Sequence, residues 1–314
     1  AGFGDVAAWA RPPTDGGIDD GWLHGRGSAD SKVGVALFAH LLASFAQAPD
    51  SFAGRLGVLF DLDEHSGAFG GARAFFDRPF AGGSPPRPDH VFIGYPGLDR
   101  IVTGGRGFLR ARLSVHGIGA HSGASRQRGV NAIGRAGELA QRLAAVPLPR
   151  PADGFALPPQ LTLTGMHAGD GGFSQVPDRC ELSLDLRLTP SFGDPLARSL
   201  VESLVRTHDA ASPELPSTAI EWIAGWPAYQ VADDSPMVMA LRAAGRVELG
   251  SELPTSVAGP SNIGNYLASL GVPALCGFGA RGENIHAVDE RVDLASIAPA
   301  YRIYRGALQA LHRR

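Results

Sequence analysis

The stretch RLGVLFDLDEHSGAFGG, residues 55–71, contains the features that decide the fold. Its apolar run over 55–62 predicts a strand, and an acidic run follows where that strand ends. The glycines that close the stretch predict a tight turn into a helix that runs through Phe76. A strand that ends in polar residues and leads into a helix is typical of a parallel α/β sheet, in which chemistry lies beyond the carboxyl ends of the strands.

The same alternation continues on both sides of this stretch. Residues 33–45 follow a helical apolar period, and Asp30 and Ser31 just before them are residue types that cap helix N-termini. The other elements predicted for this α/β part are a strand at 91–93, helices at 236–246 and 262–270, a strand at 273–278 and a final helix within 295–311.

The pattern changes between residues 106 and 224. The predicted elements there are strands at 109–115, 160–164, 181–188 and 219–223 and helices at 131–145 and 195–208. Their order is β-α-β-β-α-β, the split unit of a ferredoxin-like sandwich. We therefore predict an α/β domain over residues 1–105 and 225–314, interrupted by a ferredoxin-like α+β domain over residues 106–224.

Composition excludes several classes of protein. The formal net charge is −3, whereas nucleic-acid binders are usually strongly basic. Two cysteines among 314 residues are too few for a disulfide framework or a cysteine zinc site, so any metal must use His, Asp and Glu. The longest apolar run, residues 33–46, is shorter than the roughly 18 to 20 residues of a membrane span. With no signal peptide visible, we expect a soluble, cytoplasmic protein that binds neither membranes nor nucleic acid.

Five places in the α/β part carry side chains suited to metal binding or acid–base chemistry. They are Asp5, GRGSADSK with Asp30, DLDEHSGAFGG with Glu64 and His65, the IGYPG turn, and GENIHAVDE with His286. In this order, and with GAHSGASRQRGVNAI and SQVPDRCELSLDLR between them, they resemble the zinc-dependent exopeptidases and amidohydrolases. That family includes glutamate carboxypeptidase, aminoacylase, acetylornithine deacetylase and succinyl-diaminopimelate desuccinylase. The resemblance covers nearly the whole chain, although the strand and helix that begin the family's catalytic domain are absent here.

The resemblance implies a role for each residue of the α/β part that matches a family motif. Asp30 matches the carboxylate that bridges two metal ions, and Glu64 matches the general base that deprotonates the attacking water. His65 stands where the family usually has a metal-binding Glu, and His286 matches its C-terminal metal-binding His. Imidazole is an acceptable zinc ligand in place of carboxylate.

Two departures from the family pattern fall on the same metal ion. The family's His-x-Asp motif is here Phe3-Gly4-Asp5, so only its Asp is retained as a catalytic candidate. In IGYPG, Tyr95 replaces a ligand Glu or Asp. The second ion keeps its ligands, which are Asp30, His65 and His286. We therefore predict one zinc, or another divalent ion, per chain in a two-His, one-carboxylate site.

In the inserted domain, which is the family's lid and dimerisation domain, the resemblance assigns residues to the substrate. His121 matches a His that reaches into the partner subunit's site to polarise the scissile carbonyl, and Arg187 matches an Arg that helps to bind the substrate's carboxylate. Gln175 stands at a usual Asn position and could donate to the substrate. Near the C-terminus, Ser261 and Asn262 belong to a turn before a helix whose backbone N–H groups could receive an anionic group.

These assignments predict hydrolysis of an amide bond in a small N-acyl amino acid or dipeptide-like substrate by a metal-activated water, with Glu64 as the base. The resemblance also implies a homodimer formed through the lid. One alternative is a catalytically impaired family member that binds a small carboxylate or regulates another process. A second is a related enzyme with other amide chemistry, such as transfer or cyclisation.

Overall fold

The chain folds as two units, and each has its own buried core. Unit 1 comprises Ala1–Gly105 and Gln230–Arg314, and unit 2 comprises Arg106–Tyr229. The computed structural model describes residues 2–48, 52–64, 67, 69–77, 87–126, 129–151, 154–169 and 171–312. The chain returns from unit 2 to unit 1 after Tyr229, whereas the predicted boundary was residue 224. The difference arises because strand β10 (Ala219–Trp226) continues past residue 224.

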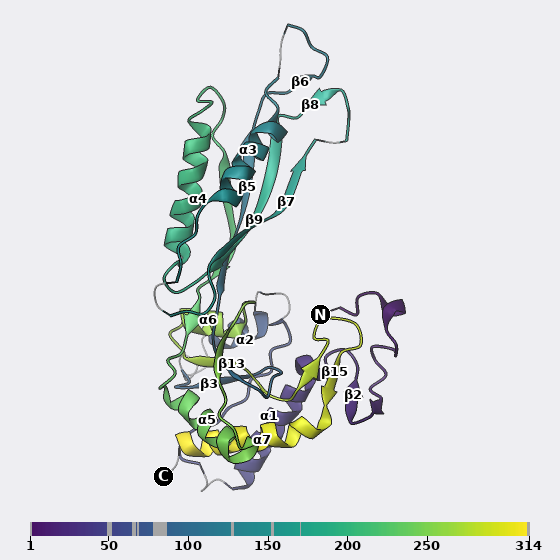
Figure 1. Cartoon of the computed structure of the whole chain (residues 1–314), viewed down its shortest axis with the longest axis vertical. Helices are drawn as coiled ribbons and strands as arrows, with labels where there is room; N and C mark the ends of the chain where they lie inside the picture. The colour runs from purple at the N-terminus through teal and green to yellow at the C-terminus, as the bar shows by residue number, and fades with distance from the viewer. Residues whose placement is uncertain are drawn as a thin grey trace. The chain divides into compact units, whose positions relative to one another are not determined.

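Unit 2 is a four-stranded antiparallel sheet in the order β10-β5-β9-β7. Its other strands are β5 (Gly107–His116), β7 (Gln160–Ala168) and β9 (Arg179–Leu188), and its helices are α3 (Ala132–Ala145) and α4 (Asp194–Asp209). Both helices lie on the same face of the sheet (Figure 1). The predicted ferredoxin-like arrangement is confirmed.

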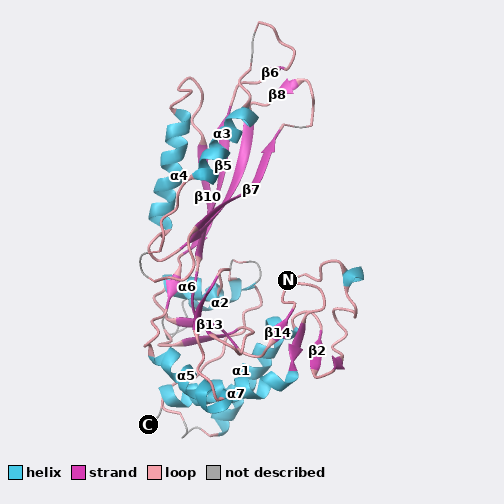
Figure 2. Ribbon diagram, in the orientation of Figure 1, coloured by secondary structure: helices cyan, strands magenta, loops and turns pink. Residues whose placement is uncertain are grey.

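Buried and more exposed side chains alternate along the strands of unit 2, which explains why one face of the sheet carries helices. In β9, Leu182, Leu184 and Leu186 are buried, while the residues between them are only partly covered. These leucines pack against the apolar stripes of α3 and α4, and each buried leucine contributes about 1.5–3 kcal/mol. The Asn131 side chain caps α3 by accepting from the Ile133 backbone N–H. The opposite face of the sheet is left with polar and charged side chains, such as Arg110 and Arg112 of β5 and Glu181 of β9. Figure 2 shows the four strands of this sheet as magenta arrows.

Unit 1 contains parallel strand pairs, as predicted for an α/β domain. Strand β13 (Ala274–Phe278) pairs in parallel with β3 (Val91–Gly94), and β12 (Thr255–Ala258) pairs in parallel with β4 (Ile101–Gly105) in the sheet β11-β4-β12. Strand β11 spans Tyr229–Gln230. A separate antiparallel sheet has the order β1 (Ile18–Asp19), β2 (Trp22–His24), β15 (Arg291–Asp293) and β14 (Gly282–Glu283).

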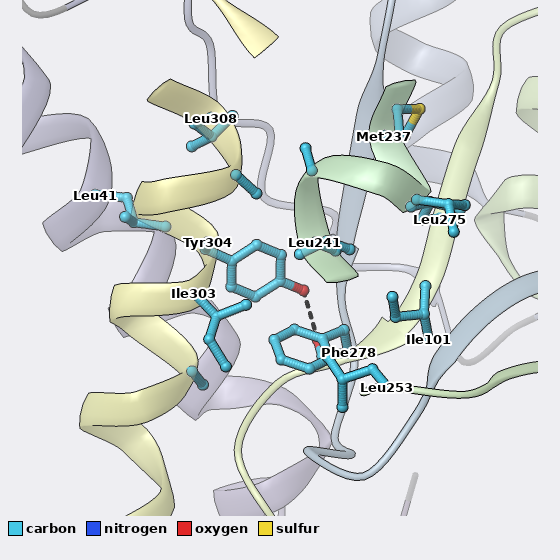
Figure 3. Packing of buried hydrophobic residues seen from close by; sticks show 14 of the residues in the cluster. Leu41, Ile101, Met237, Leu241, Leu253, Leu275, Phe278, Ile303, Tyr304 and Leu308 are labelled. Atoms are coloured by element: carbon cyan, nitrogen blue, oxygen red, sulfur yellow. Dashed lines mark hydrogen bonds between the residues drawn. The ribbon is translucent and has the colours of Figure 1, made fainter. Parts of the chain in front are cut away.

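The helices of unit 1 are α1 (Val33–Gln47), α2 (Gly70–Phe76), α5 (Pro236–Leu249), α6 (Ile263–Ser269) and α7 (Ile297–Leu311), with the short elements η1 (Val6–Ala8), η2 (Ser28–Lys32) and η5 (Leu294–Ser296). The core of the unit gathers around Tyr304 of α7, which is 1% exposed (Figure 3). Its hydroxyl donates to the Phe278 carbonyl at 2.5 Å, so the one polar atom of the ring is satisfied. Burial raises the pKa of Tyr304, which keeps this donor protonated.

The strand predicted at residues 55–62 is wrong. The structure shows no ladder pairing for this segment among the described residues, and Leu59 and Phe60 are each 44% exposed. The segment instead lines a cavity of about 1070 Å³ within unit 1, together with β3 and α1. A strand forms only where a neighbour supplies ladder hydrogen bonds, and in the described residues β3 pairs with β13 alone.

The helical stretch Ser28–Gln47 is long and apolar enough to cross a membrane by length and composition. This stretch is longer than the apolar run of residues 33–46 because it includes η2, in which Asp30 and Ser31 have non-helical backbone angles. Leu37, Leu41 and Phe45 on this helix are buried in the core of unit 1, as in the core helix of a globular domain. The cytoplasmic location stays a prediction.

Candidate metal and catalytic site

Two of the predicted metal ligands lie side by side in unit 1. Asp30 belongs to η2, and His286 belongs to the loop between β14 and β15. Although they are 256 positions apart in the chain, His286 Nε2 lies 2.6 Å from Asp30 Oδ2. The Asp30 side chain is 4% exposed, whereas that of His286 is 51% exposed. The pair therefore joins a buried carboxylate to an imidazole that is open to solvent.

Glu290 holds the turn that carries Asp30. It is fully buried, and its Oε1 accepts from the backbone N–H groups of Ala29 at 3.1 Å and Asp30 at 2.9 Å. Its Oε2 accepts from Arg26 Nη1 at 2.8 Å. The Arg26 guanidinium in turn lies over the Trp9 ring, 4.9 Å from its centroid. Glu290 follows His286 closely in the HAVDE motif, so one short segment supplies both the imidazole and the support of its carboxylate partner.

Asp30 does not cap α1, contrary to the prediction from local sequence. The N-cap residue is Lys32, which makes no side-chain capping bond. Asp30 and Ser31 have non-helical backbone angles within η2, and the peptide bond between them is cis. The Asp30 side chain contacts His286 Nε2, at 2.6 Å, rather than the helix N-terminus.

A second carboxylate, Glu64, lies at the same end of unit 1. Burial is the largest cause of the raised pKa of the Cys276 thiol on β13 and of the Tyr95 phenol just after β3. The charges of Glu64 and Asp30 raise both pKa values further. Because β13 and β3 are parallel, this is the carboxyl end of the pair, where a parallel sheet is expected to carry its chemistry. Burial raises the pKa of the Tyr95 phenol, and a phenol is not among the usual zinc ligands, which are Cys, His, Asp and Glu.

The third predicted ligand, His65, lies outside the described residues. In the part of the chain that is described, no group of three or more His, Cys, Asp and Glu side chains is arranged to hold a metal. Asp30 and His286 nevertheless supply two donor groups of the types that zinc binds, with His286 Nε2 2.6 Å from Asp30 Oδ2. These residues fit a divalent ion that is completed by a ligand from beyond them, and the number of ions stays a prediction.

The retained residue of the first motif has a local structural role. Asp5 is exposed and caps η1, because its Oδ1 accepts from the Ala7 backbone N–H at 3.0 Å. Phe3, at the position of the family's ligand His, is 44% exposed, and its carbonyl accepts from Trp9 Nε1 at 2.8 Å. The catalytic role of Asp5 stays a prediction.

In unit 2, the structure brings two predicted substrate residues together. His121 lies in β6 (Ala120–His121) and Gln175 in β8 (Gln175–Val176), and the two residues face each other across this antiparallel pair. His121 Nδ1 accepts from the Gly123 backbone N–H at 3.0 Å, which leaves Nε2 as the donor nitrogen of a neutral ring. Both residues are exposed, as a residue that contacts a substrate must be.

Arg187 lies on the open face of the unit 2 sheet, opposite Phe108 of β5 and Gln160 of β7 in the strand register. Its Nε is 2.7 Å from Asp185 Oδ1. The guanidinium is thus oriented by a neighbouring carboxylate, and it is 26% exposed.

Near α6, the structure gives Asn262 a capping role. Its side chain accepts from the Gly264 backbone N–H at 2.8 Å, and its own N–H donates to Asn265 Oδ1 at 2.8 Å, which together form a capping box. Asn262 is 8% exposed. The predicted contact of Ser261 and Asn262 with an anionic substrate group stays a prediction.

Sequence reasoning missed the supporting residues. Glu290 and Arg26 both lie inside quoted motifs, but neither was given a role. The sequence did carry a signal. Arg26 lies close to the predicted ligand Asp30, and Glu290 lies close to the predicted ligand His286, so two opposite charges are found in segments that were expected to meet. Asp61 was also missed: its carboxylate accepts from the backbone N–H groups of Gly71 at 3.1 Å and Ala72 at 2.9 Å, and so caps α2.

With this geometry in place, comparison with known proteins identifies the class. The sequence model of peptidase family M20/M25/M40 matches residues 3–310. The chain therefore belongs to this family of metallo-hydrolases, as its motifs indicated.

Individual relatives agree with this assignment. The succinyl-diaminopimelate desuccinylase of Cupriavidus taiwanensis is 27% identical over 313 residues, which are 98% of this chain and 79% of the relative. The enzyme of the same name from Azoarcus sp. is 29% identical over 316 residues, with 98% and 79% covered. Among solved structures, aminopeptidase PepT of Bacillus cereus superposes with a TM-score of 0.74 at 19% identity, over 94% of this chain and 75% of that one. An M20 family metallo-carboxypeptidase of Sulfolobus solfataricus superposes with a TM-score of 0.72 at 17% identity, over 99% and 82%. The two structures show the fold.

Proposed function

We propose that the chain hydrolyses an amide bond in a small N-acyl amino acid or dipeptide-like substrate. The observation that carries the proposal is the 2.6 Å approach of His286 Nε2 to the buried Asp30 carboxylate, at the strand end where Glu64 also lies. The names of the relatives, which include a desuccinylase, an aminopeptidase and a metallo-carboxypeptidase, support amide-bond chemistry.

The proposed site holds one zinc or other divalent ion through Asp30, His286 and His65. When bound, such an ion polarises a carbonyl oxygen and lowers the pKa of water. Glu64 takes a proton from the attacking water and delivers it to the leaving amine. His121 donates to the carbonyl oxygen as it gains negative charge, and Arg187 binds a carboxylate of the substrate. We further propose that the chain forms a homodimer through unit 2.

Glu64→Gln tests the assignment of the base. Because a positioned general base contributes about 10²–10⁴-fold, we expect kcat on a panel of N-succinyl and N-acetyl amino acids and dipeptides to fall by that factor. The metal content measured by elemental analysis should not change, because Glu64 is not a proposed ligand. Asp63→Asn is the matched control, since it removes the exposed carboxylate next in the chain and should leave kcat within about twofold.

The rival function is a small-carboxylate binding or regulatory protein. It is favoured by the two neutral aromatic residues, Phe3 and Tyr95, at positions where the family has metal ligands. Ligand binding without any product, together with identical behaviour of the wild type and Glu64→Gln, would establish the rival. Turnover that persists in Glu64→Gln would show instead that another group is the base.

A further inference from the structure

Two imidazole rings that the proposed chemistry does not use lie next to each other in unit 1. His90 directly precedes β3, and His312 follows the last turn of α7. The centres of the two rings are 6.3 Å apart, and the ring planes are inclined at 60°. Both residues are partly exposed and line the cavity of unit 1, so an ion in solution can reach them.

The two rings lie away from the Asp30–His286 pair. His90 precedes β3, whereas Tyr95, whose pKa responds to the charge of Asp30, follows the other end of the strand, five positions later. At about 3.3 Å per residue, the two ends of the strand are roughly 16 Å apart. An ion at His90 therefore shares no ligand with the proposed catalytic ion.

One ring nitrogen of His90 lacks the partner that a buried nitrogen needs. Nδ1 of His90 is buried, and among the described residues it has no hydrogen-bond partner. Buried polar atoms in native proteins nearly always have a partner, and a bound ion is one way to supply it. A neutral imidazole has one nitrogen without a proton, and that nitrogen can bind a metal ion.

His312 is fixed in position, while its ring nitrogens stay accessible. Its backbone N–H donates to the Leu308 carbonyl at 3.2 Å, and its own carbonyl accepts from the Ala53 N–H at 2.9 Å. The ring packs on Phe52, with the ring centres 4.6 Å apart. A Cβ at position 54 would lie 3.3 Å from His312 Nδ1, so Gly54 leaves this nitrogen open.

The separation of the rings fits two imidazoles that share one metal ion. A zinc–nitrogen bond is about 2.0–2.1 Å long, and the ring centre lies about 1.1 Å behind the nitrogen, so the two ring centres can be at most about 6.4 Å apart. The observed 6.3 Å lies within this limit. Zinc, nickel and copper are the divalent ions that imidazole ligands suit.

We propose that His90 and His312 bind one divalent transition-metal ion, which joins the end of α7 to the start of β3. Water completes its coordination. Two protein donors hold an ion less tightly than the three of the proposed catalytic site, so this ion is retained only while free metal is present. The count after purification is therefore unchanged. The inference goes beyond the proposed function and does not depend on it.

Isothermal titration calorimetry with zinc chloride tests the site, on the full chain with the ion that survives purification. We expect one further zinc ion to bind per chain. His90→Gln and His312→Gln should each weaken this further binding by at least about tenfold, which is about 1.4 kcal/mol. His40→Gln is the matched control, because His40 is an exposed histidine on α1, and it should change the affinity by less than about twofold.

The unfolding midpoint gives a second measurement. Because an ion that binds only the folded chain stabilises it, added zinc should raise the midpoint of the wild type and of His40→Gln more than that of the two other variants.

Circular dichroism shows whether each variant is folded. His312→Phe, which keeps a ring on Phe52, takes the place of His312→Gln where that variant does not fold. The absence of further zinc binding by the folded wild type, or further binding that neither His90→Gln nor the His312 variant weakens, would overturn the proposal. Equal weakening by His40→Gln would overturn it too. Absence of amide hydrolysis would remove the proposed function and leave this site standing.

Discussion

The Asp30–His286 pair of unit 1 and the His121–Gln175 pair of unit 2 are held in place by opposite means. Asp30 rests on buried groups, since Glu290 accepts from its backbone and is itself paired with Arg26. His121 and Gln175 lie on a two-residue ladder and are exposed. A buried polar group must find partners or lose several kcal/mol, so the Asp30 half of the first pair has one arrangement fixed by folding. The second pair can adjust to a substrate at little cost to stability.

Breaking the buried support should give the largest effect. Glu290→Gln removes the charge that pairs with Arg26, which is 9% exposed, and leaves a buried cation without its counter-ion. We expect a loss of about 3–5 kcal/mol in the free energy of unfolding, measured by urea denaturation.

Glu283→Gln is the control for this loss. Glu283 also pairs with an arginine, Arg291, at 2.6 Å in the neighbouring hairpin, but both side chains are at least 36% exposed. Its loss should cost less than about 1 kcal/mol. Similar destabilisation by the two variants would contradict the view that burial makes the Glu290 pair different.

Removing the exposed histidine should affect catalysis and not folding. His121→Ala deletes the proposed donor to the carbonyl oxygen, so kcat should fall about 10²–10³-fold, equivalent to about 2.7–4 kcal/mol in activation free energy. The free energy of unfolding should stay within about 0.5 kcal/mol of the wild type. His167→Ala, at another exposed position of unit 2, should change neither quantity. A drop in stability as large as the drop in kcat would show that His121 is structural.

The smallest effect concerns a buried histidine on α4 that the proposed chemistry does not use. His208 is 3% exposed, and its pKa is lowered, first by burial and then by Arg135 on α3; Arg142 acts in the same direction, and Asp209 and Glu138 oppose it. The unfolded chain therefore binds a proton more readily than the folded one as pH falls below about 6.5.

The stability of unit 2 should accordingly be complete near pH 8 and decline on acidification, by at most about 1.4 kcal/mol per pH unit for one proton. Urea denaturation between pH 8 and pH 5 measures this slope, and His208→Gln should reduce it. An unchanged slope in the variant would assign the acid sensitivity to other groups.

The two regions also differ in how far sequence could predict them. In the strands and helices of unit 2, apolar residues recur with periods of 2 and 3.6 residues. These periods can be recognised in a short window of sequence, so β9 and α3 were predicted closely. The Asp30–His286 approach depends on segments far apart in the chain, and only the family resemblance joined them. Local reasoning made Asp30 a helix cap, because the competing partner, His286, is invisible to a local window.

Two further features could not be predicted because they depend on tertiary partners. The apolar residues 55–62 read as a strand, but strand formation requires a neighbour for the backbone, and sequence does not show whether one is present. Glu290 was missed since a buried acid looks the same in sequence as an exposed one. In each case a side chain or segment was assigned from its own chemistry, while its role was set by what it contacts.

The number of metal ions per chain tests the central claim most directly. Elemental analysis of protein purified without chelator should find one divalent ion in the unaltered chain, held by Asp30 and His286 with His65. The Phe3→His plus Tyr95→Glu variant, which restores a ligand at each altered position, should hold two. An equal count in the two chains, or no ion in an unaltered chain shown to be folded, would contradict the account.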